Sequence, residues 1–370
     1  MADVMHVWAG TGQQAILNDV ALRPRTVDGS SSVPLMTRGG QAWAYHLVDD
    51  NDEGWILKKF LPGKQPGPAY LGEIRSLIPN RSGFESGFER KVLDGLSVSA
   101  SAYCEPEFQS WISGTILMRQ VVSPTWAELA VSIREGSKVL SRVERLFLCA
   151  KLSEKLQWLE SAGLAHRDLS STNVMIDPVN VEVHLIDWDS LFHATLPLPS
   201  NATPGTEGYM APFAGAGGES SAHLTWQEHS DRFGLTILNA EILSVNTGSP
   251  LAGEGGSFDQ EDLYNRAGRT VFQVRNNLQH YFPAAAKLLD AALVARSFER
   301  CPGPSDWISL INRELPSSAQ AVWDEESLAV EESQSVYAPS YEPHFVQVNS
   351  AAFVRVDRKA FVKAPPNHQQ

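Results

Sequence analysis

Cysteine, long apolar runs and basic side chains are all scarce in this chain of 370 residues. Its three cysteines, Cys104, Cys149 and Cys301, lie far apart and include no pair with the spacing of a metal site. Cys149 falls in an apolar stretch with helical spacing, where a buried free thiol is the expected state. Reduced thiols favour the cytoplasm as the compartment.

No stretch approaches the roughly 18 uninterrupted apolar residues of a membrane span, and the N-terminus lacks the basic and apolar segments of a signal peptide. Acidic residues outnumber basic ones by 43 to 30, which gives a formal net charge of −13. Broad nucleic-acid binding needs a dense positive surface, so a nucleic acid is not an expected partner. Because no membrane span is visible, a membrane is not an expected partner either. Over the whole chain, 43% of the residues are apolar and 20% are charged, which is the composition of a globular protein.

The first third of the chain has mostly strand patterns. Residues 42–48 and 55–60 are apolar and aromatic runs on either side of a polar turn, which predicts a hairpin. Residues 69–78 have helical spacing. Residues 108–122 are expected to form two more strands around a Ser-Gly turn.

Helical patterns dominate after Trp126. The clearest helix covers residues 142–162, where Ser141 and Glu144 fit a capping box. Four further helices are expected over residues 231–244, 261–281, 284–295 and 305–313. Strands first and helices afterwards predict an α+β protein in two lobes.

The tail from Pro316 differs in character from the rest of the chain. It has an acidic stretch and few helix signals, which is compatible with a solvated linker. Residues 345–348 and 353–362 alternate like strands and could form a small hairpin.

The most informative segment lies between His166 and Asp189 and contains His-Arg-Asp-Leu-Ser-Ser-Thr-Asn, followed later by Leu-Ile-Asp-Trp-Asp. Asp168 stands five residues before Asn173, which puts a base and a metal ligand on one short loop. Asp187 follows an apolar run and can bind a second face of the same metal. These groups suit phosphoryl transfer, in which the protein mainly positions reactants and neutralises charge.

This segment resembles the catalytic loop and metal-binding segment of protein kinases, and is most similar to bacterial Ser/Thr-kinase-like domains. The resemblance covers roughly residues 35–313 and implies a two-lobed protein-kinase-like fold. The β-rich N-lobe that binds ATP would span residues 35–121, and the helical C-lobe residues 122–315. An N-terminal segment, 1–34, and a C-terminal tail, 316–370, would flank them.

The resemblance implies that Lys58 binds the α- and β-phosphates of ATP. Lys58 ends a Trp-Ile-Leu-Lys strand that matches the family, although Lys59 is an alternative on the opposite face. Glu73, on the first helix after that strand, is the expected ion-pair partner of Lys58. Glu85 and Glu89 compete for this role.

Two backbone segments are expected to contact ATP by the same resemblance. The glycine-rich phosphate cover would consist of Gly39, Gly40, Gln41 and Ala42, although Ala42 stands where the family has a glycine. The segment that joins the lobes and binds adenine would include Met118, Arg119 and Val121, with Arg119 in place of the usual acidic residue.

In the catalytic loop, Asp168 would orient or accept the proton of the acceptor hydroxyl, and Asn173 and Asp187 would bind Mg²⁺. Ser170 stands where Ser/Thr kinases usually carry a lysine, and Asp187-Trp188-Asp189 replaces the usual Asp-Phe-Gly. Ile-Asp-Trp-Asp also resembles aminoglycoside and choline phosphotransferases, so a small-molecule acceptor stays open.

A later segment, from Pro204 to Pro212, resembles the end of a kinase activation segment and favours a protein acceptor. Thr206 would then contact Asp168. Asp231 would hydrogen-bond the backbone of the catalytic loop, with a simple helix N-cap as its alternative role. Phe213 stands where the family has a glutamate that pairs with an arginine, so packing by Phe213 would replace that ion pair.

Together these features predict an ATP- and Mg²⁺-dependent kinase that phosphorylates Ser or Thr of a protein. Autophosphorylation would fall on the activation segment, at Thr195, Ser200, Thr203 or Thr206. One alternative is a small-molecule kinase. The other is a non-catalytic, ATP-binding signalling module, suggested by Ala42, Ser170 and Phe213.

Overall fold

The computed structural model describes residues 4–199, 202–215, 219–252 and 255–316. Its fold is mixed α+β, with a curled antiparallel sheet and many helices, which confirms the predicted class. The chain divides into two compact units. The first contains Met1–Ser123, His184–Pro204 and Gly217–Glu228, and the second contains Pro124–Val183, Gly205–Ala216 and His229–Gln370.

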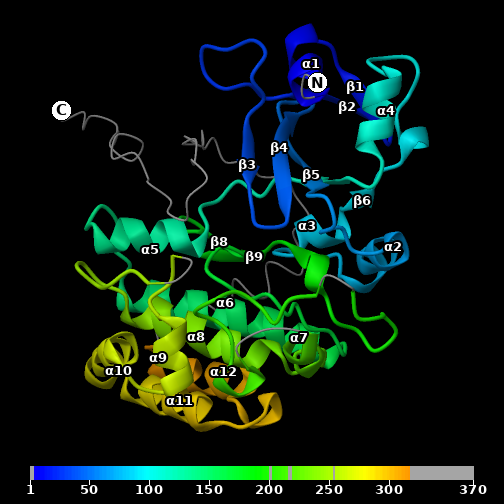
Figure 1. The fold of residues 1–370 in the computed structure, drawn as a ribbon. Coiled ribbons are helices and arrows are strands. Elements are labelled where there is room, and N and C mark those ends of the chain that lie inside the picture. The colour runs from blue at the N-terminus through cyan, green and yellow to red at the C-terminus, as the bar shows by residue number, and fades with distance from the viewer. Residues whose placement is uncertain (1–3, 200–201, 216–218, 253–254, 317–370) are drawn as a thin grey trace, which may run out of the picture. The chain divides into compact units, whose positions relative to one another are not determined.

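The first unit is built on a seven-stranded antiparallel sheet with the order β1-β2-β4-β5-β7-β6, and β3 pairs with β4 (Figure 1). Its strands are β1 (Ala15–Leu17), β2 (Val20–Pro24), β3 (Met36–Arg38), β4 (Ala42–Val48), β5 (Gly54–Phe60), β6 (Lys91–Val92) and β7 (Ile116–Arg119).

The hairpin predicted from residues 42–60 is confirmed as β4 and β5, in full antiparallel register from Ala42↔Phe60 to Val48↔Gly54. The side chain of Asp49 organises the turn between them. Its Oδ1 accepts hydrogen bonds from the backbone N–H groups of Asn51 and Glu53, and its Oδ2 accepts one from Trp55 Nε1. These bonds to its charged form lower the pKa of Asp49, although burial alone would raise it.

Part of the N-terminal segment belongs to the core of this sheet. Met5 and Trp8 on α1 (Val4–Thr11) are fully buried and pack in one cluster with Leu17 and Leu22 of β1 and β2. The Trp8 indole donates to the Gln13 carbonyl at 3.0 Å, which satisfies its polar atom inside the cluster. Removing residues 1–34 would therefore expose the sheet core.

The prediction of two strands over residues 108–122 is wrong for its first half. Residues Pro106–Ile112 form helix α4, and only Ile116–Arg119 is a strand. Pro106 occupies the first helical turn, where its missing N–H costs nothing. Phe108 and Ile112, four residues apart, are the buried face, so a helical period was present in a stretch short enough to resemble strand alternation.

The helix predicted at residues 69–78 is confirmed as α2 (Pro68–Leu77). Leu71 and Ile74 are buried on its inner face. The first unit also contains α3 (Glu85–Phe88), the 3₁₀ helices η1 (Gly95–Ser97) and η2 (Trp188–Ser190), and α7 (Glu219–Leu224).

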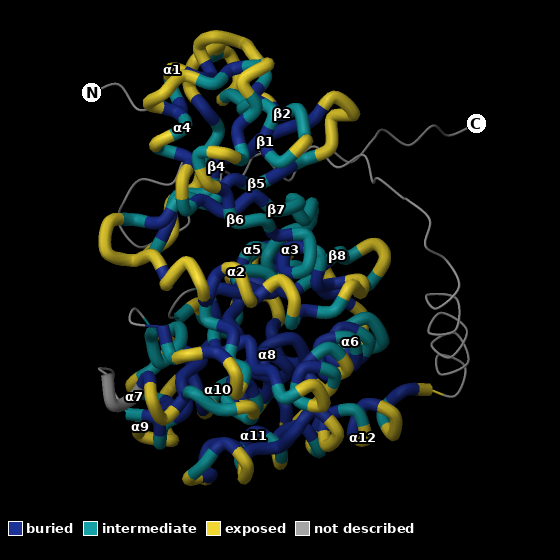
Figure 2. The backbone as a smooth tube through the Cα atoms, turned by 90° about the vertical axis from the view of Figure 1, so that its right-hand side faces the viewer, coloured by how far each residue is buried: buried dark blue, intermediate teal, exposed yellow. Residues whose placement is uncertain are grey.

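Helices dominate the second unit, and α8 (Asp231–Ser244) lies at its centre. Every residue of α8 except Arg232 is buried, as the dark tube in Figure 2 shows. It packs against α6, α10 and α11. The helices around it are α5 (Trp126–Arg134), α6 (Arg142–Ser161), α9 (Gln260–Asn265), α10 (Arg269–Tyr281), α11 (Pro283–Val294) and α12 (Pro304–Glu314). The remaining elements are β8 (Val174–Asp177), β9 (Glu182–Leu185), η3 (Pro212–Ala214) and η4 (Phe298–Arg300).

The capping box predicted for α6 is confirmed. The Ser141 side chain accepts from the Glu144 N–H, and the Glu144 carboxylate accepts from the Ser141 N–H. Cys149, on the same helix, is a fully buried free thiol as predicted, and burial raises its pKa well above the ordinary value. Such a thiol is unreactive at neutral pH.

The single helix predicted over residues 261–281 is wrong, because the chain breaks into α9 and α10. Arg266 adopts a left-handed conformation (φ 55°) and Gly268 has φ 123°, which few side chains tolerate. Asp262 Oδ2 then accepts from the backbone N–H and the hydroxyl of Thr270, at 2.8 and 2.7 Å, and so stabilises the start of α10. The other three predicted helices are α8, α11 and α12, displaced by at most one residue at each end.

The strand-like stretches predicted at residues 345–348 and 353–362, and the acidic stretch before them, lie outside the described residues. Among the helices that are described, none is both long and apolar enough to cross a membrane.

His46 makes the stability of the first unit sensitive to acid. Burial in β4 lowers its pKa to about 4, which outweighs a hydrogen bond with Gln120. Between about pH 6.5 and 4, the His46 imidazole is protonated in the unfolded chain but stays neutral in the folded protein. The stability from neutral His46 is therefore complete above about pH 6.5 and is lost as the pH falls.

We expect His46→Gln to lose less stability than the wild type between pH 7 and 4.5, by roughly 2–3 kcal/mol at about 1.4 kcal/mol for each pH unit. Urea unfolding of both proteins at the two pH values measures this difference. His280→Gln is the matched control, because His280 is exposed on α10. An equal loss of stability in wild type and His46→Gln would contradict this account.

Candidate active site

Lys58 on β5 carries the central charge of the candidate site in the first unit. Its Nζ lies 2.6 Å from Asp187 Oδ1 and 2.6 Å from Asp189 Oδ2. Burial alone would lower the pKa of Lys58, but the two carboxylates raise it above its ordinary value, so the ammonium stays charged. Lys59 has a different role, because its Nζ donates to the carbonyls of Trp111 and Ser113.

The segment Asp187–Asp189 brings both carboxylates to Lys58. Asp187 adopts a left-handed conformation (φ 65°, ψ 63°), which a β-branched residue would rarely adopt. Trp188 between them is buried, donates from Nε1 to Ser86 Oγ at 3.2 Å and packs on the Phe84 ring. The anchored indole therefore fixes the two aspartates on either side of it.

Glu73 is not the partner of Lys58, which corrects the prediction from the sequence. Its side chain is exposed on α2, and the carboxylates within ion-pair distance of Lys58 are those of Asp187 and Asp189. The two competing glutamates are engaged elsewhere. Glu85 pairs with His184 at 3.1 Å, and Glu89 with Arg119 at 3.3 Å.

The predicted phosphate cover is the exposed turn between β3 and β4. Gly39 N–H donates to the Ala42 carbonyl at 2.9 Å and closes this turn, and Gln41 lies at its end. A Cβ atom at Gly40 would meet nothing within 4 Å, and one at Gly39 would touch only the Ala42 carbonyl at 3.7 Å. Packing within the first unit therefore does not require these glycines, whereas close approach of a ligand to the backbone would.

The predicted adenine-binding segment begins within β7, because Met118 and Arg119 are the last two residues of this strand. Met118 pairs with Ile56 inside the sheet. The Arg119 guanidinium pairs with Glu53 and Glu89 and lies 4.2 Å from the centre of the Trp55 ring. This side chain is therefore engaged by other residues of the first unit. Within the described chain, no hydrogen bond engages the backbone N–H or C=O of Val121.

In the second unit, Asp168 gathers the other predicted groups. Its Oδ1 accepts from the Thr206 hydroxyl at 2.7 Å, which confirms the predicted contact. The Asn173 amide donates to Asp168 Oδ2 at 3.1 Å and to the Asp168 carbonyl at 2.8 Å. Ser170, at the position where Ser/Thr kinases carry a lysine, is buried and hydrogen-bonds the Thr172 hydroxyl at 3.0 Å.

Asp231 fixes the backbone of this loop, as predicted. It is 3% exposed, and its two oxygens accept from the backbone N–H groups of His166 and Arg167 at 2.6 and 2.7 Å. Arg167 has φ 67°, a conformation that costs of order 1–3 kcal/mol and persists only where the surroundings impose it. The rival role as N-cap does not apply, because Ser230 holds that position.

Two features of the second unit hold the stretch that contains Thr206. Tyr209 donates its hydroxyl to the buried Glu241 at 2.9 Å, and Trp126 donates its Nε1 to the same oxygen at 3.0 Å. Phe213 packs edge-on against Phe298 with ring centres 4.8 Å apart. Glu241 is not among the residues predicted from the sequence, although a glutamate inside an otherwise apolar helix is a signal for a buried hydrogen-bond acceptor.

The residues predicted to bind Mg²⁺ carry suitable oxygen atoms. The amide nitrogen of Asn173 donates to Asp168. Within the described chain, no hydrogen bond engages the Oδ1 atom of Asn173. One carboxylate oxygen of Asp187 forms an ion pair with Lys58, and the Asp187 side chain is 39% exposed. The described residues contain no group of three or more His, Cys, Asp or Glu that could hold a metal. Mg²⁺ often binds through one or two protein oxygens and completes its shell with phosphates and water, so the chemistry of each of these two groups suits this cation.

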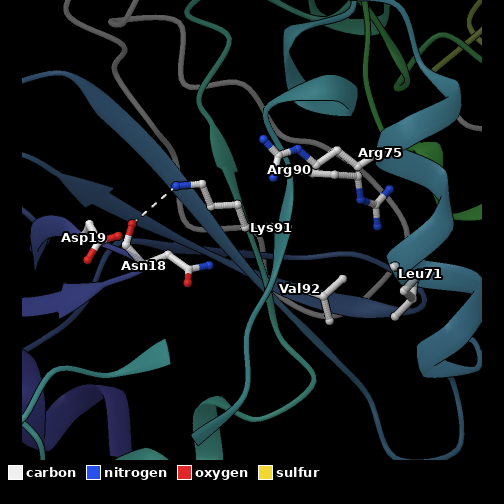
Figure 3. Close-up of a pocket in the computed structure, with 8 residues that line it drawn as sticks. Asn18, Asp19, Leu71, Arg75, Arg90, Lys91 and Val92 are labelled. Atoms are coloured by element: carbon white, nitrogen blue, oxygen red, sulfur yellow. Dashed lines mark hydrogen bonds between the residues drawn. The ribbon is translucent and has the colours of Figure 1, made fainter. Parts of the chain in front are cut away.

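A cavity of about 400 Å³ lies elsewhere in the first unit (Figure 3). Leu71 and Arg75 of α2 line it together with Lys91 of β6 and the turn between β1 and β2. Lys91 Nζ donates to the Asn18 carbonyl at 3.3 Å across one side. The cavity contains none of the residues predicted to bind ATP, but Arg90 forms part of its wall.

No family model matches the chain, and the search of curated proteins found no match. What the protein does has to be inferred from the contacts of its own residues.

We expect Asp231→Ala to lower the free energy of unfolding by about 2–4 kcal/mol, because two buried N–H groups lose their acceptor at about 1–3 kcal/mol each. Burial raises the pKa of Asp231, so the desolvation of its carboxylate already offsets part of the gain. Urea unfolding followed by circular dichroism measures the change. Asp290→Asn, which removes an exposed surface pair with Arg275, should change stability by less than about 0.5 kcal/mol. A similar small effect in Asp231→Ala would contradict the anchoring role.

Proposed function

We propose that the chain is an ATP- and Mg²⁺-dependent kinase with a two-lobed protein-kinase-like fold, acting on Ser or Thr of a protein. The observation that carries the proposal is the arrangement around Asp168. An amide and a hydroxyl from two separate segments converge on this carboxylate, and a buried aspartate holds its loop in a strained conformation. An exposed loop that is merely rich in Asp and Asn would need no such anchoring.

In this proposal the first unit binds the nucleotide. Lys58 contacts the α- and β-phosphates, and the exposed Gly39–Gly40 turn covers them with the backbone N–H of Gly40, since that of Gly39 closes the turn. The backbone of Val121, which has no partner in the described chain, hydrogen-bonds adenine. Arg119 contributes only backbone, because its guanidinium is engaged with Glu53 and Glu89.

The reacting groups would come from Asp168, Asn173 and Asp187. Asp168 accepts the proton of the acceptor hydroxyl as the oxygen attacks the γ-phosphorus and the bond to the β-phosphate oxygen breaks. Asn173 Oδ1 and the Asp187 carboxylate would hold Mg²⁺, which neutralises charge on the phosphates when bound. Asn173 also orients Asp168 through its amide hydrogens.

A protein is proposed as the acceptor because the described stretch 205–215 belongs to the second unit and is held within it. Thr206 bonds Asp168 and Tyr209 bonds Glu241, so this stretch can present a stable surface to a peptide. The three thiols are all free, which suits the reducing cytoplasm.

The test is transfer of labelled γ-phosphate from Mg-ATP to the chain itself and to a generic basic protein. We expect Asp168→Asn and Asp187→Asn each to lower kcat by about 10²–10⁴-fold, because each removes a group that acts in the transition state. Asp290→Asn, far from these residues in sequence and exposed, should retain wild-type activity.

Parallel reactions with choline, aminoglycosides and sugars distinguish the acceptor class. Transfer to one of these and not to protein would replace the protein acceptor with a small molecule. Absence of transfer to every acceptor, with no binding of Mg-ATP by calorimetry, would refute the proposed activity.

A further inference from the structure

We propose that Asp189, held in place by Arg90, is the residue that positions Lys58 for the phosphates of ATP, in the role that a helix glutamate was expected to have. This inference rests on the proposed function and assigns to the Asp187–Asp189 segment a second task besides metal binding.

The geometry places Asp189 between two cations. Its Oδ2 lies 2.6 Å from Lys58 Nζ, and its Oδ1 lies 2.6 Å from Arg90 Nη2. The side chains of Asp189 and Arg90 are 8% and 3% exposed. Each carboxylate oxygen therefore binds a different cation, and the distance from Lys58 to Arg90 is fixed through one buried group.

Asp187 cannot replace Asp189 in this role. It also contacts Lys58, but it is 39% exposed and is the proposed ligand of Mg²⁺. A bound divalent cation would draw its negative charge away from the lysine. Asp189 is buried, so it remains the partner of Lys58 when the metal is present.

Arg90 gives the cluster its charge balance. Lys58 and Arg90 supply two positive charges, and Asp187 and Asp189 supply two negative ones. Buried ions are tolerated when they are paired and hydrogen-bonded, whereas loss of one partner leaves an uncompensated charge. Arg90 directly precedes β6 and lies in the wall of the cavity in Figure 3, so the rigid sheet carries it.

The indole of Trp188 sets the position of Asp189. Gly87 is required next to it, because a Cβ atom there would lie 2.9 Å from Trp188 Nε1 and 2.7 Å from Ile78 Cδ1. This close approach leaves the indole bonded to Ser86 and directs the following aspartate toward β5. The position of Lys58 thus depends on residues 86–90 and 187–189, and not on the exposed Glu73.

The experiment measures steady-state kinetics of phosphoryl transfer for Asp189→Asn, with Glu73→Gln as the matched control. We expect kcat/KM for ATP to fall at least tenfold in Asp189→Asn, while the KM for the protein acceptor stays within twofold. A purely structural defect would lower the active fraction and leave the KM for ATP unchanged, so a raised KM for ATP identifies positioning. Glu73→Gln should match the wild type within twofold.

Arg90→Gln tests the support of Asp189. It should reduce kcat/KM for ATP in the wild type but have no further effect in the Asp189→Asn background, because Arg90 acts through Asp189. The double variant also removes both charges of the buried pair, so it can fold where Asp189→Asn alone does not. A larger loss in Glu73→Gln than in Asp189→Asn, or additive effects of Arg90→Gln and Asp189→Asn, would overturn the proposal.

Calorimetric binding of Mg-ATP separates this inference from the proposed function. If the wild type binds Mg-ATP but transfers no phosphate, the kinase proposal fails, and a tenfold weaker affinity in Asp189→Asn still supports the positioning role. Unchanged affinity in that variant would refute the role. If the wild type neither transfers phosphate nor binds Mg-ATP, both proposals are refuted.

Discussion

The ammonium of Lys58, shared between two aspartates, is the interaction on which the candidate site depends. Buried charges such as those of Lys58, Arg90 and Asp189 persist only when each is matched, and here the half-exposed Asp187 completes the balance of two cations and two carboxylates. The pairing also explains features distant in sequence. Trp188 is buried between the two aspartates, and a Cβ atom at Gly87 would clash with its indole and with Ile78.

A single buried carboxylate has the equivalent role in the second unit. Asp231 is the first residue of a helix that is buried almost throughout, so its desolvation is costly and raises its pKa. Two backbone N–H groups offset that cost and hold Arg167 in a left-handed conformation. The loop that carries Asp168 and Asn173 is thus fixed by the core of α8.

The sequence predicted well the features that depend on local chemistry. The β4–β5 hairpin and the capping box of α6 follow from spacing and residue type, and the structure contains both. The contact between Thr206 and Asp168 is implied by the resemblance to a kinase activation segment, and the structure contains it as well. Prediction from the sequence failed where the structure depends on contacts between residues far apart in the chain. Phe108 and Ile112 show a helical face only when their burial is known, and the partner of Lys58 was sought on the nearest helix. A one-dimensional pattern gives no distance between Lys58 and a residue 131 positions later.

The sequence Asp187-Trp188-Asp189 determines how the candidate site is assembled. Where a lysine takes its partner from a mobile helix, movement of that helix can break the pair while the metal ligand stays in place. Here Asp187 and Asp189 are separated by one anchored tryptophan, so the lysine contact and the proposed metal contact form or break together. Glu73 is exposed on α2, and the ion pairs of Lys58 are those with Asp187 and Asp189. Displacement of residues 187–189 would therefore disrupt both contacts, and α2 reaches this region through the Tyr70 hydroxyl, which donates to the Leu191 carbonyl at 2.7 Å.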